Sequence, residues 1–161
     1  MDNNDILRRL RYTFSLNDRQ MIALFAEADH TVTREQTSAW LKRDDDPELV
    51  PLDDAQMATF LNGLIIQRRG KRDGSVPVAE TRLNNNIVFR KLKIALNLKD
   101  DDILALLDRA GFPIGKPALS ALFRKPGHKN YRECKDQILR NFLKGLQLEH
   151  HADAPSDDTQ D

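Results

Sequence analysis

The basic segment at residues 124–134 contains the side chains with the clearest capacity for chemistry. Its sequence, RKPGHKNYREC, holds four Lys and Arg residues against one glutamate. Such cations bind phosphate, and a histidine and a tyrosine among them can hydrogen-bond or stack. The Pro126-Gly127 pair predicts a turn. The segment is therefore predicted to be an anion-binding loop, with charge and hydrogen bonds supplied by Arg124, Lys125, His128, Lys129 and Arg132. The alternative is an ordinary basic loop between helices, whose Tyr131 covers the core.

Cys134 and His128 suggest a second chemistry, in which a nearby base and positive charge activate a thiolate nucleophile. In the internal repeat described below, however, Cys134 corresponds to Leu52. Because free cysteine is commonly buried as a small apolar residue, we expect Cys134 in the core. No cluster has zinc-ligand spacing, and residues 70–74 lack the flanking strand and helix of a phosphate-binding glycine loop. The sequence thus predicts no catalytic residue, metal or cofactor, and a protein that is not an enzyme.

Two further sets of basic residues are candidates for a wider surface. Lys116, Ser120 and Arg124 recur at intervals of four, which places them on one polar face of an expected helix. Arg90 and Lys93 lie three apart on one face of another expected helix. One interpretation is a helix-turn-helix whose polar stripe faces a DNA groove. The other interpretation is a solvated, charged helix face.

A tandem repeat supplies the elements that position these residues. An ungapped offset of 82 aligns residues 3–67 with residues 85–149, and sixteen of the 65 aligned pairs are identical. The basic segment then falls opposite residues 42–52, KRDDDPELVPL, which carry two positive and four negative charges. This contrast between equivalent loops is the best pointer in the sequence to a binding surface.

Each repeat is predicted to contain four short helices, because apolar residues recur at helical spacing in both copies. The second helices are expected over residues 19–28 and 101–110, and the third helices end near Lys42 and Arg124. Cap residues are expected at Asn4 and Asn86 for the first helix, Asp18 and Asp100 for the second, Thr33 and Gly115 for the third, and Asp53 and Asn130 for the fourth.

Gly63 and Gly145 occupy the same place inside the fourth helix. Glycine destabilises a helix interior, so a shared glycine indicates close backbone packing, and we expect another element to cross there. Alternation with a period of two is nowhere sustained. The predicted fold class is all-α, a tandem repeat of two four-helix units with about eight helices and no significant sheet.

Charge divides the chain into four segments. The first repeat, 3–67, has a net charge of −4, the linker 68–84 has +3, the second repeat, 85–149, has +6, and the tail 150–161 has −4. The basic, glycine-containing linker is expected to be exposed and mobile, and the acidic tail to be disordered. Such asymmetry indicates a half that faces a polyanion, or two complementary surfaces.

The cellular compartment is predicted from composition. A single cysteine excludes an internal disulfide framework and fits a reducing compartment. No hydrophobic run approaches the roughly 20 residues of a membrane span, and the acidic start, MDNND, is unlike a secretory signal. We therefore expect a cytoplasmic protein with no membrane partner.

Two stretches resemble a known family. Residues 85–93 read NNIVFRKLK and residues 124–134 read RKPGHKNYREC. In these stretches the chain is similar to the YehS-like bacterial proteins, which are built from a tandem domain of unknown function. The resemblance covers both repeats, roughly from Asp2 to Leu148. It implies an intracellular bacterial protein with a duplicated fold, and it carries over no activity, cofactor or catalytic residue.

The leading functional hypothesis is a non-enzymatic binding module whose second repeat contacts a polyanion, with nucleic acid as the first candidate. The residues expected to bind are Lys116, Ser120, Arg124, Lys125, His128, Lys129 and Arg132, extended by Arg90 and Lys93. The alternative is a protein-interaction adaptor or self-associating module. In that case the acidic residues 44–48 dock onto the basic segment, within one molecule or between two.

Overall fold

The computed structural model describes residues 1–152. They form eight α-helices and no strand, so the predicted all-α tandem fold is confirmed. The helices are α1 (Asn3–Thr13), α2 (Asp18–Glu27), α3 (Arg34–Trp40), α4 (Asp54–Arg69), α5 (Asn85–Ala95), α6 (Asp100–Arg109), α7 (Lys116–Leu122) and α8 (Asp136–His150). The acidic tail, residues 150–161, was predicted to be disordered. Its first residue, His150, is the last residue of α8, and residues 153–161 lie outside the part of the chain that the structure describes.

Three helix starts agree with the expected capping residues. The Thr33 hydroxyl accepts a hydrogen bond from the Gln36 backbone N–H at 3.1 Å, and the Gln36 side chain accepts one in return from the Thr33 N–H. Asp53 forms the same capping box at the start of α4. Gly115 precedes α7 as predicted. Local sequence therefore determines these three starts.

The other cap predictions are wrong, by one to five residues. The residue before the first helical turn is Asp2 in α1, Asn17 in α2, Asn84 in α5, Lys99 in α6 and Lys135 in α8. Asp18 and Asp100 instead occupy the first helical position, where their charge still favours the helix dipole. Asn4 and Asn86 lie inside the first turn and are buried, and their side chains bond to the end of the third helix and to the following loop, far along the chain.

The predicted close contact at Gly63 and Gly145 is confirmed. A Cβ atom added to Gly63 would lie 1.7 Å from the Leu24 carbonyl oxygen, and one added to Gly145 would lie 2.2 Å from the Leu106 carbonyl oxygen. The second helix of each repeat thus crosses the fourth helix with its backbone touching the glycine. No larger residue fits at this crossing.

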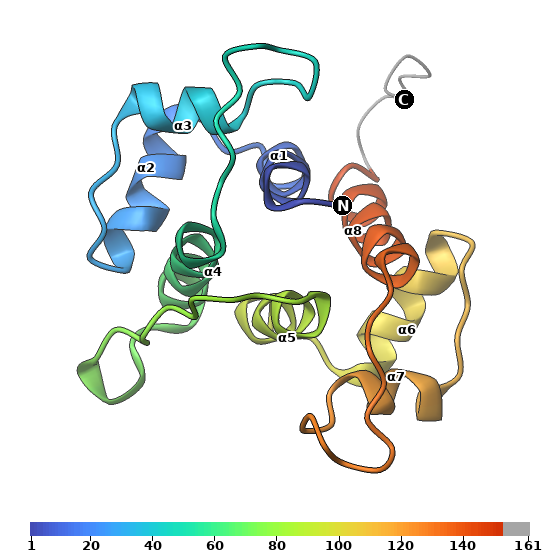
Figure 1. The fold of residues 1–161 in the computed structure, drawn as a ribbon. Helices are drawn as coiled ribbons and strands as arrows, with labels where there is room; N and C mark the ends of the chain where they lie inside the picture. The colour runs from blue at the N-terminus through green and yellow to red at the C-terminus, as the bar shows by residue number, and fades with distance from the viewer. Residues whose placement is uncertain (153–161) are drawn as a thin grey trace.

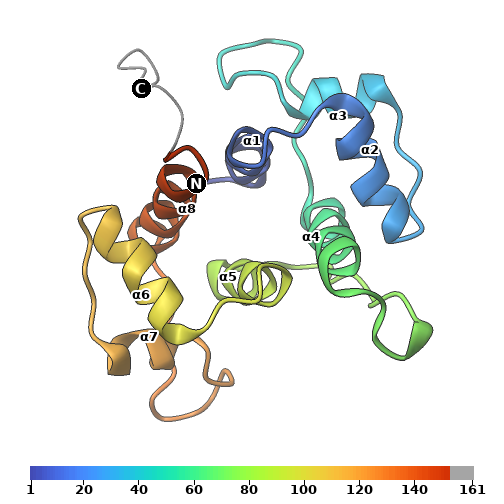
Figure 2. The same cartoon turned by 180° about the vertical axis from the view of Figure 1, so that it is seen from behind.

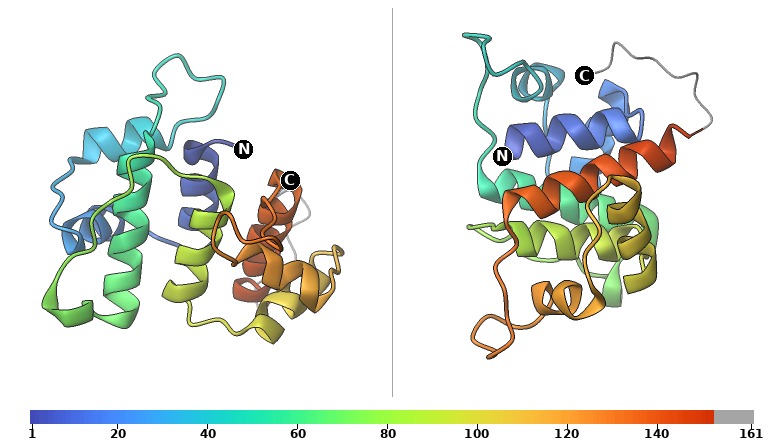
Figure 3. Two further views of the ribbon diagram at one scale, coloured as in Figure 1. Left: turned by 60° about the horizontal axis from the view of Figure 1, so that its bottom comes forward. Right: turned by 90° about the vertical axis from the view of Figure 1, so that its right-hand side faces the viewer.

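The two repeats are related by an approximate two-fold rotation (Figures 1 and 2). α1, α4, α5 and α8 form a central group, and the pairs α2–α3 and α6–α7 lie at opposite ends of the molecule. The last helix of each repeat packs on the first helix of the other, α4 on α5 and α8 on α1. Figure 3 shows α1 and α8 side by side. Each repeat therefore completes the core of its partner repeat.

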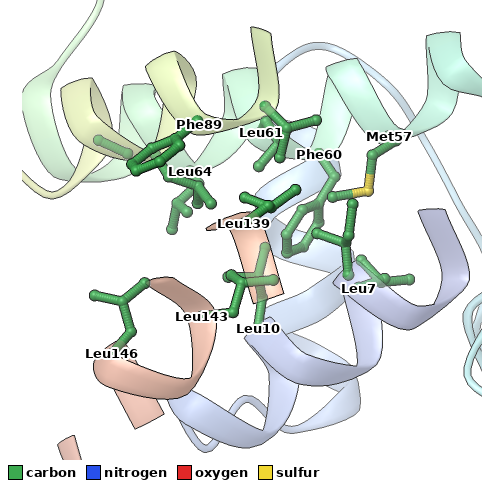
Figure 4. Packing of buried hydrophobic residues seen from close by; sticks show 14 of the residues in the cluster. Leu7, Leu10, Met57, Phe60, Leu61, Leu64, Phe89, Leu139, Leu143 and Leu146 are labelled. Atoms are coloured by element: carbon green, nitrogen blue, oxygen red, sulfur yellow. The ribbon is translucent and has the colours of Figure 1, made fainter. Parts of the chain in front are cut away.

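Apolar side chains from these four helices meet in one core (Figure 4). Each of them is at most 2 % exposed, and burial of such side chains is the dominant stabilising term in folding. The side chains labelled in Figure 4 are Leu7, Leu10, Met57, Phe60, Leu61, Leu64, Phe89, Leu139, Leu143 and Leu146.

Equivalent hydrogen bonds tie each repeat to the start of the other. Asp54 of α4 accepts a bond from the Leu83 backbone N–H at 2.9 Å, and Asp136 of α8 accepts one from the Met1 ammonium group at 2.7 Å. Leu83 and Met1 are equivalent under the 82-residue offset. The hydrogen bond from this ammonium group, and a second from Asn85, lower the pKa of Asp136.

The linker 68–84 begins as the last residues of α4 and continues through a short 3₁₀ turn, Arg72–Gly74. Residues 67–75 are all exposed, as expected. Towards its end the linker is anchored to α5, since Glu80 pairs with Lys91 at 3.0 Å. The connection therefore runs on the surface and adds no element of its own to the core.

Candidate anion-binding site

A buried asparagine in each repeat organises the loop between the third and fourth helices. The Asn86 side-chain amide donates hydrogen bonds to the carbonyl oxygens of Leu122 and Arg132, at 3.0 and 2.8 Å, and its oxygen accepts one from the Cys134 N–H at 2.9 Å. Asn4 makes the same three bonds to the first-repeat loop. We call residues 42–52 the acidic loop and residues 124–134 the basic loop.

The two loops share one backbone arrangement although their charges are opposite. The Arg132 N–H donates to the Ala121 carbonyl oxygen at 3.0 Å, as the Val50 N–H does to that of Ala39 at 3.1 Å. In the basic loop the His128 Nδ1 atom accepts a bond from the Asn130 N–H at 3.0 Å. In the acidic loop a carboxylate takes the equivalent place, since Asp46 accepts a hydrogen bond from the Glu48 N–H at 2.9 Å.

This hydrogen bond assigns a structural role to His128. Its Nδ1 atom is an acceptor, so the neutral ring carries its hydrogen on Nε2. The side chain is exposed and holds the turn of the basic loop, as Asp46 holds the turn of the acidic loop. The difference between the loops is therefore one of side-chain charge on a common scaffold.

An open hollow lies between α7 and the basic loop, and its volume is about 720 Å³. We call it the basic hollow. Four of the site residues that we predicted from the sequence line this hollow, namely Ser120, Arg124, Lys129 and Arg132. The other lining residues are Pro117, Ala118, Ala121, Asn130 and Tyr131.

The cations of the basic hollow have no acidic partner in the part of the chain that the structure describes. Among residues 1–152, no carboxylate oxygen lies within 4.0 Å of the charged nitrogens of Arg124, Lys129 or Arg132. All three side chains are exposed. Their charge is therefore available to a bound anion.

The remaining predicted residues of this region lie outside the hollow. Lys125 and His128 are exposed on the outer part of the basic loop. Lys116, in the first turn of α7, lies 3.8 Å from Asp101 of α6. Arg124 follows the end of α7 rather than lying on it, so the expected helical stripe is shorter than predicted.

Arg90 and Lys93 of α5 make contacts within the protein. Arg90 donates to the Phe123 carbonyl oxygen at 3.3 Å, which holds α5 to the start of the basic loop. Lys93 pairs with Asp100 at 2.9 Å and lies 4.4 Å from the centre of the Phe123 ring. Since Lys93 already has a carboxylate partner, it offers less free charge than the cations of the hollow.

The connection between α6 and α7 is long for a helix-turn-helix. Residues 110–115 separate the two helices, and α7 has only seven residues, whereas the motif joins its helices by a turn of about three or four residues. The equivalent helix α3 lies at the opposite end of the molecule (Figure 1). The polar face of α3 therefore does not extend the surface at α7.

The two charged loops do not meet within one molecule. They project from opposite ends of the structure (Figures 1 and 2), and no ion pair joins them among residues 1–152. The intramolecular version of the docking hypothesis is therefore wrong. The rotation that relates the repeats places equivalent loops far apart.

Cys134 lies in the core, as predicted, and is 2 % exposed. Burial raises the pKa of its thiol to about 12. His128, the base suggested for it, is exposed and bonds to Asn130 instead. The nucleophile hypothesis thus lacks both an accessible thiolate and an adjacent base.

One acidic cluster in the described part of the chain has the spacing of metal ligands, at Asp2, Asp5 and Asp44. The guanidinium group of Arg8 donates hydrogen bonds to Asp5 and, at 2.9 Å, to Asp44. This internal cation already offsets part of the negative charge of the cluster. Within residues 1–152 no helix is long and apolar enough to cross a membrane.

Comparison with known proteins identifies the family. The family model described as "Protein of unknown function (DUF1456)" matches residues 3–70 and again residues 85–151. The chain belongs to this family. It is also 44 % identical over 153 residues to the "Uncharacterized protein YehS" of Escherichia coli (strain K12), covering 94 % of this chain and 97 % of that protein. No solved structure matches the chain.

Two matches of the DUF1456 model in one chain agree with the duplication in the structure. Sequence reasoning did not single out two features of the second copy. Tyr131 was expected only as a residue of the basic segment that could hydrogen-bond or stack, and its place in the lining of the hollow was not predicted, while Asn86 fixes the loop instead of capping α5. The signal for Asn86 was present, because Asn3-Asn4 and Asn85-Asn86 are identical in the two repeats.

Proposed function

We propose that this DUF1456 protein is a binding module whose second repeat contacts a polyanion, and that the polyanion is nucleic acid. The observation that carries the proposal is the basic hollow, where Arg124, Lys129 and Arg132 surround a space of about 720 Å³ without a carboxylate partner in residues 1–152. That volume falls within the range of about 300–1,000 Å³ that ligand sites occupy.

Electrostatics over the whole second repeat support the same function. Its net charge of +6 contrasts with −4 for the first repeat, so a polyanion is attracted to one end of the molecule. Guanidinium groups match phosphate geometry with paired donors. Two of the three cations in the hollow are arginines.

The test is binding of a labelled oligonucleotide and of heparin over a series of salt concentrations. Affinity should fall steeply with salt, because each phosphate contact releases counterions. The Arg124→Glu/Arg132→Glu double variant should bind about tenfold or more weakly and show a smaller salt slope. Absence of binding by the wild-type protein at low salt would contradict the proposal.

A matched control separates the hollow from general charge. Lys71→Glu/Arg72→Glu makes the same change in net charge in the exposed linker, at residues that form no ion pair within residues 1–152. This variant should bind within about threefold of wild type, since long-range charge is partly screened by salt. An equal loss in both double variants would show that the hollow is not the site.

The second candidate function is self-association or adaptor activity, favoured by two loops with one scaffold and opposite charges at opposite ends of the molecule. A contact from acidic loop to basic loop between neighbouring molecules is heterologous, so it forms chains unless it closes into a ring. Sedimentation at low and high salt tests it. A monomer at every salt concentration would exclude self-association by this contact.

A further inference from the structure

We propose that the basic hollow binds single-stranded nucleic acid, with one base stacked on Tyr131 and the adjacent phosphate held by Arg124 and Arg132. This inference rests on the proposed function, and it specifies that the nucleic acid is single-stranded and that Tyr131 stacks on one of its bases. It begins from Tyr131, which is the only aromatic residue among those that line the hollow.

Tyr131 is half-buried but lies outside the core cluster. It belongs neither to the buried hydrophobic cluster nor to the partly buried residues that pack against it. The earlier alternative, in which Tyr131 covers the core, is therefore not supported. Its hydroxyl group makes no hydrogen bond to any other part of residues 1–152. The equivalent residue in the acidic loop is Leu49, so the fold does not require an aromatic ring there.

The backbone on both sides of the ring is fixed. The Tyr131 N–H donates to the His128 carbonyl oxygen at 2.9 Å. The next residue, Arg132, donates its N–H to Ala121 at 3.0 Å and accepts from the Asn86 side chain at 2.8 Å. Ring and guanidinium group therefore extend from a preorganised loop, which lowers the entropy lost on binding.

The same residues are the usual components of a single-strand site. Proteins of this kind combine cations that follow the backbone with aromatic rings on which unpaired bases stack. The basic hollow has three cations and one ring within nine consecutive residues, 124–132. A base in a duplex presents only its edges, so the ring would have no face to stack against.

The geometry of α7 disfavours recognition of a duplex groove. With seven residues, α7 is about 10 Å long, and its first-turn lysine, Lys116, lies 3.8 Å from Asp101. The equivalent helix α3, with its single basic residue Arg34, lies at the opposite end of the molecule and cannot extend the contact. The available surface therefore suits a few nucleotides of one strand.

The experiment compares four labelled probes by fluorescence anisotropy at one low salt concentration. They are a 12-nucleotide RNA, the DNA strand of the same sequence, the corresponding DNA duplex, and heparin. The full-length protein should bind a single strand at least about fivefold more tightly than the duplex. A preference for RNA or for DNA among single strands identifies the natural source, and either preference supports the inference.

Two variants at Tyr131 test the stacking contact. Tyr131→Phe keeps the ring and should bind single strands within about twofold of wild type. Tyr131→Leu introduces the residue of the acidic loop and should weaken single-strand binding about 5- to 150-fold, the range for losing one stacked base. Heparin has no bases, so its affinity should be the same for both variants. Thermal melting confirms that the variants are folded.

The outcomes distinguish the two levels of the proposal. Equal binding of duplex and single strand, or full single-strand binding by Tyr131→Leu, would overturn this inference and leave polyanion binding intact. Failure to bind any of the four probes would overturn the proposed function as well. Loss of heparin binding in folded Tyr131→Leu would show that the ring supports the loop rather than a base.

Discussion

At the scale of single residues, the buried asparagines decide the shape of both loops. Each of Asn4 and Asn86 satisfies three backbone groups that would otherwise be unpaired at the end of the third helix and in the following loop. Buried polar groups of this kind are costly when unmatched. The pair explains how loops with different sequences keep one conformation.

Replacement of the asparagine should destabilise the fold. Asn86→Ala leaves the Cys134 N–H and two carbonyl oxygens without their partner. We expect the free energy of unfolding, measured by urea denaturation, to fall by at least about 1–3 kcal/mol. Asn4→Ala should cost a similar amount, because it removes the same three bonds from the acidic loop.

The two variants should differ in binding. Because Asn86, and not Asn4, supports the basic loop, Asn86→Ala should also weaken polyanion binding at a temperature where both variants are folded, whereas Asn4→Ala should not. Equal binding by the two variants would show that the fixed loop is not needed. Unchanged stability in both would contradict the structural role of the asparagines.

At the scale of helices, the crossings at Gly63 and Gly145 set the distance between the second and fourth helix of each repeat. The backbone of α2 touches Gly63, and that of α6 touches Gly145. Helix propensity alone would favour alanine at both positions. Packing therefore overrides local preference at the same place in both copies.

Alanine at either crossing should force the helices apart. In Gly145→Ala the new Cβ atom would lie 2.2 Å from the Leu106 carbonyl oxygen, a backbone atom that can move only with α6. We expect a loss of about 1–3 kcal/mol or more in unfolding free energy. Gly115→Ala is the control without a clash, because its nearest neighbour would be 3.7 Å away; it changes only the cap residue of α7, and the loss should be about 1 kcal/mol or less.

At the scale of the whole molecule, the duplication produces a nearly symmetric framework with asymmetric ends. The central helices pair reciprocally, α4 with α5 and α8 with α1. The acidic and basic loops then project from opposite ends. This charge pattern would repel a polyanion at one end and attract it at the other, and would so orient the molecule on the polyanion that we propose it binds.

The link between the repeats at Asp136 should depend on pH. Its pKa is lowered in the folded state by hydrogen bonds from the Met1 ammonium group and from Asn85. A lowered pKa means that the carboxylate stabilises the fold above the ordinary value of 3.8, and that this contribution is lost as pH falls through the folded-state pKa. Asp136→Asn should therefore lower Tm at pH 7.

The difference in Tm between wild type and Asp136→Asn should shrink as pH falls below 3.8. Thermal melting of both proteins between pH 2.5 and pH 7 measures it. Because this carboxylate is near the surface, solvent screening keeps the effect small. A Tm difference that stays constant over that range would contradict the assigned role of the charge.

The sequence by itself determined the duplication, the four helices of each copy, the glycine crossings and the buried position of Cys134. Apolar periodicity is visible in residues that are close together in the sequence, and the duplication is visible when the chain is compared with itself at one fixed offset. Neither signal requires knowledge of the tertiary structure. The charge contrast between residues 42–52 and 124–134 was also readable at that level.

Only the tertiary structure decided which polar side chains remain free to bind a ligand. Lys93 and Lys116 lie beside Asp100 and Asp101, and Asn86 bonds to residues 36 to 48 positions further along the chain. The exposed face of Tyr131 likewise depends on how α7 and the basic loop pack. Hydrogen bonds and ion pairs act over about 3–4 Å. Their partners are therefore set by packing between distant segments, which no local pattern in the sequence records.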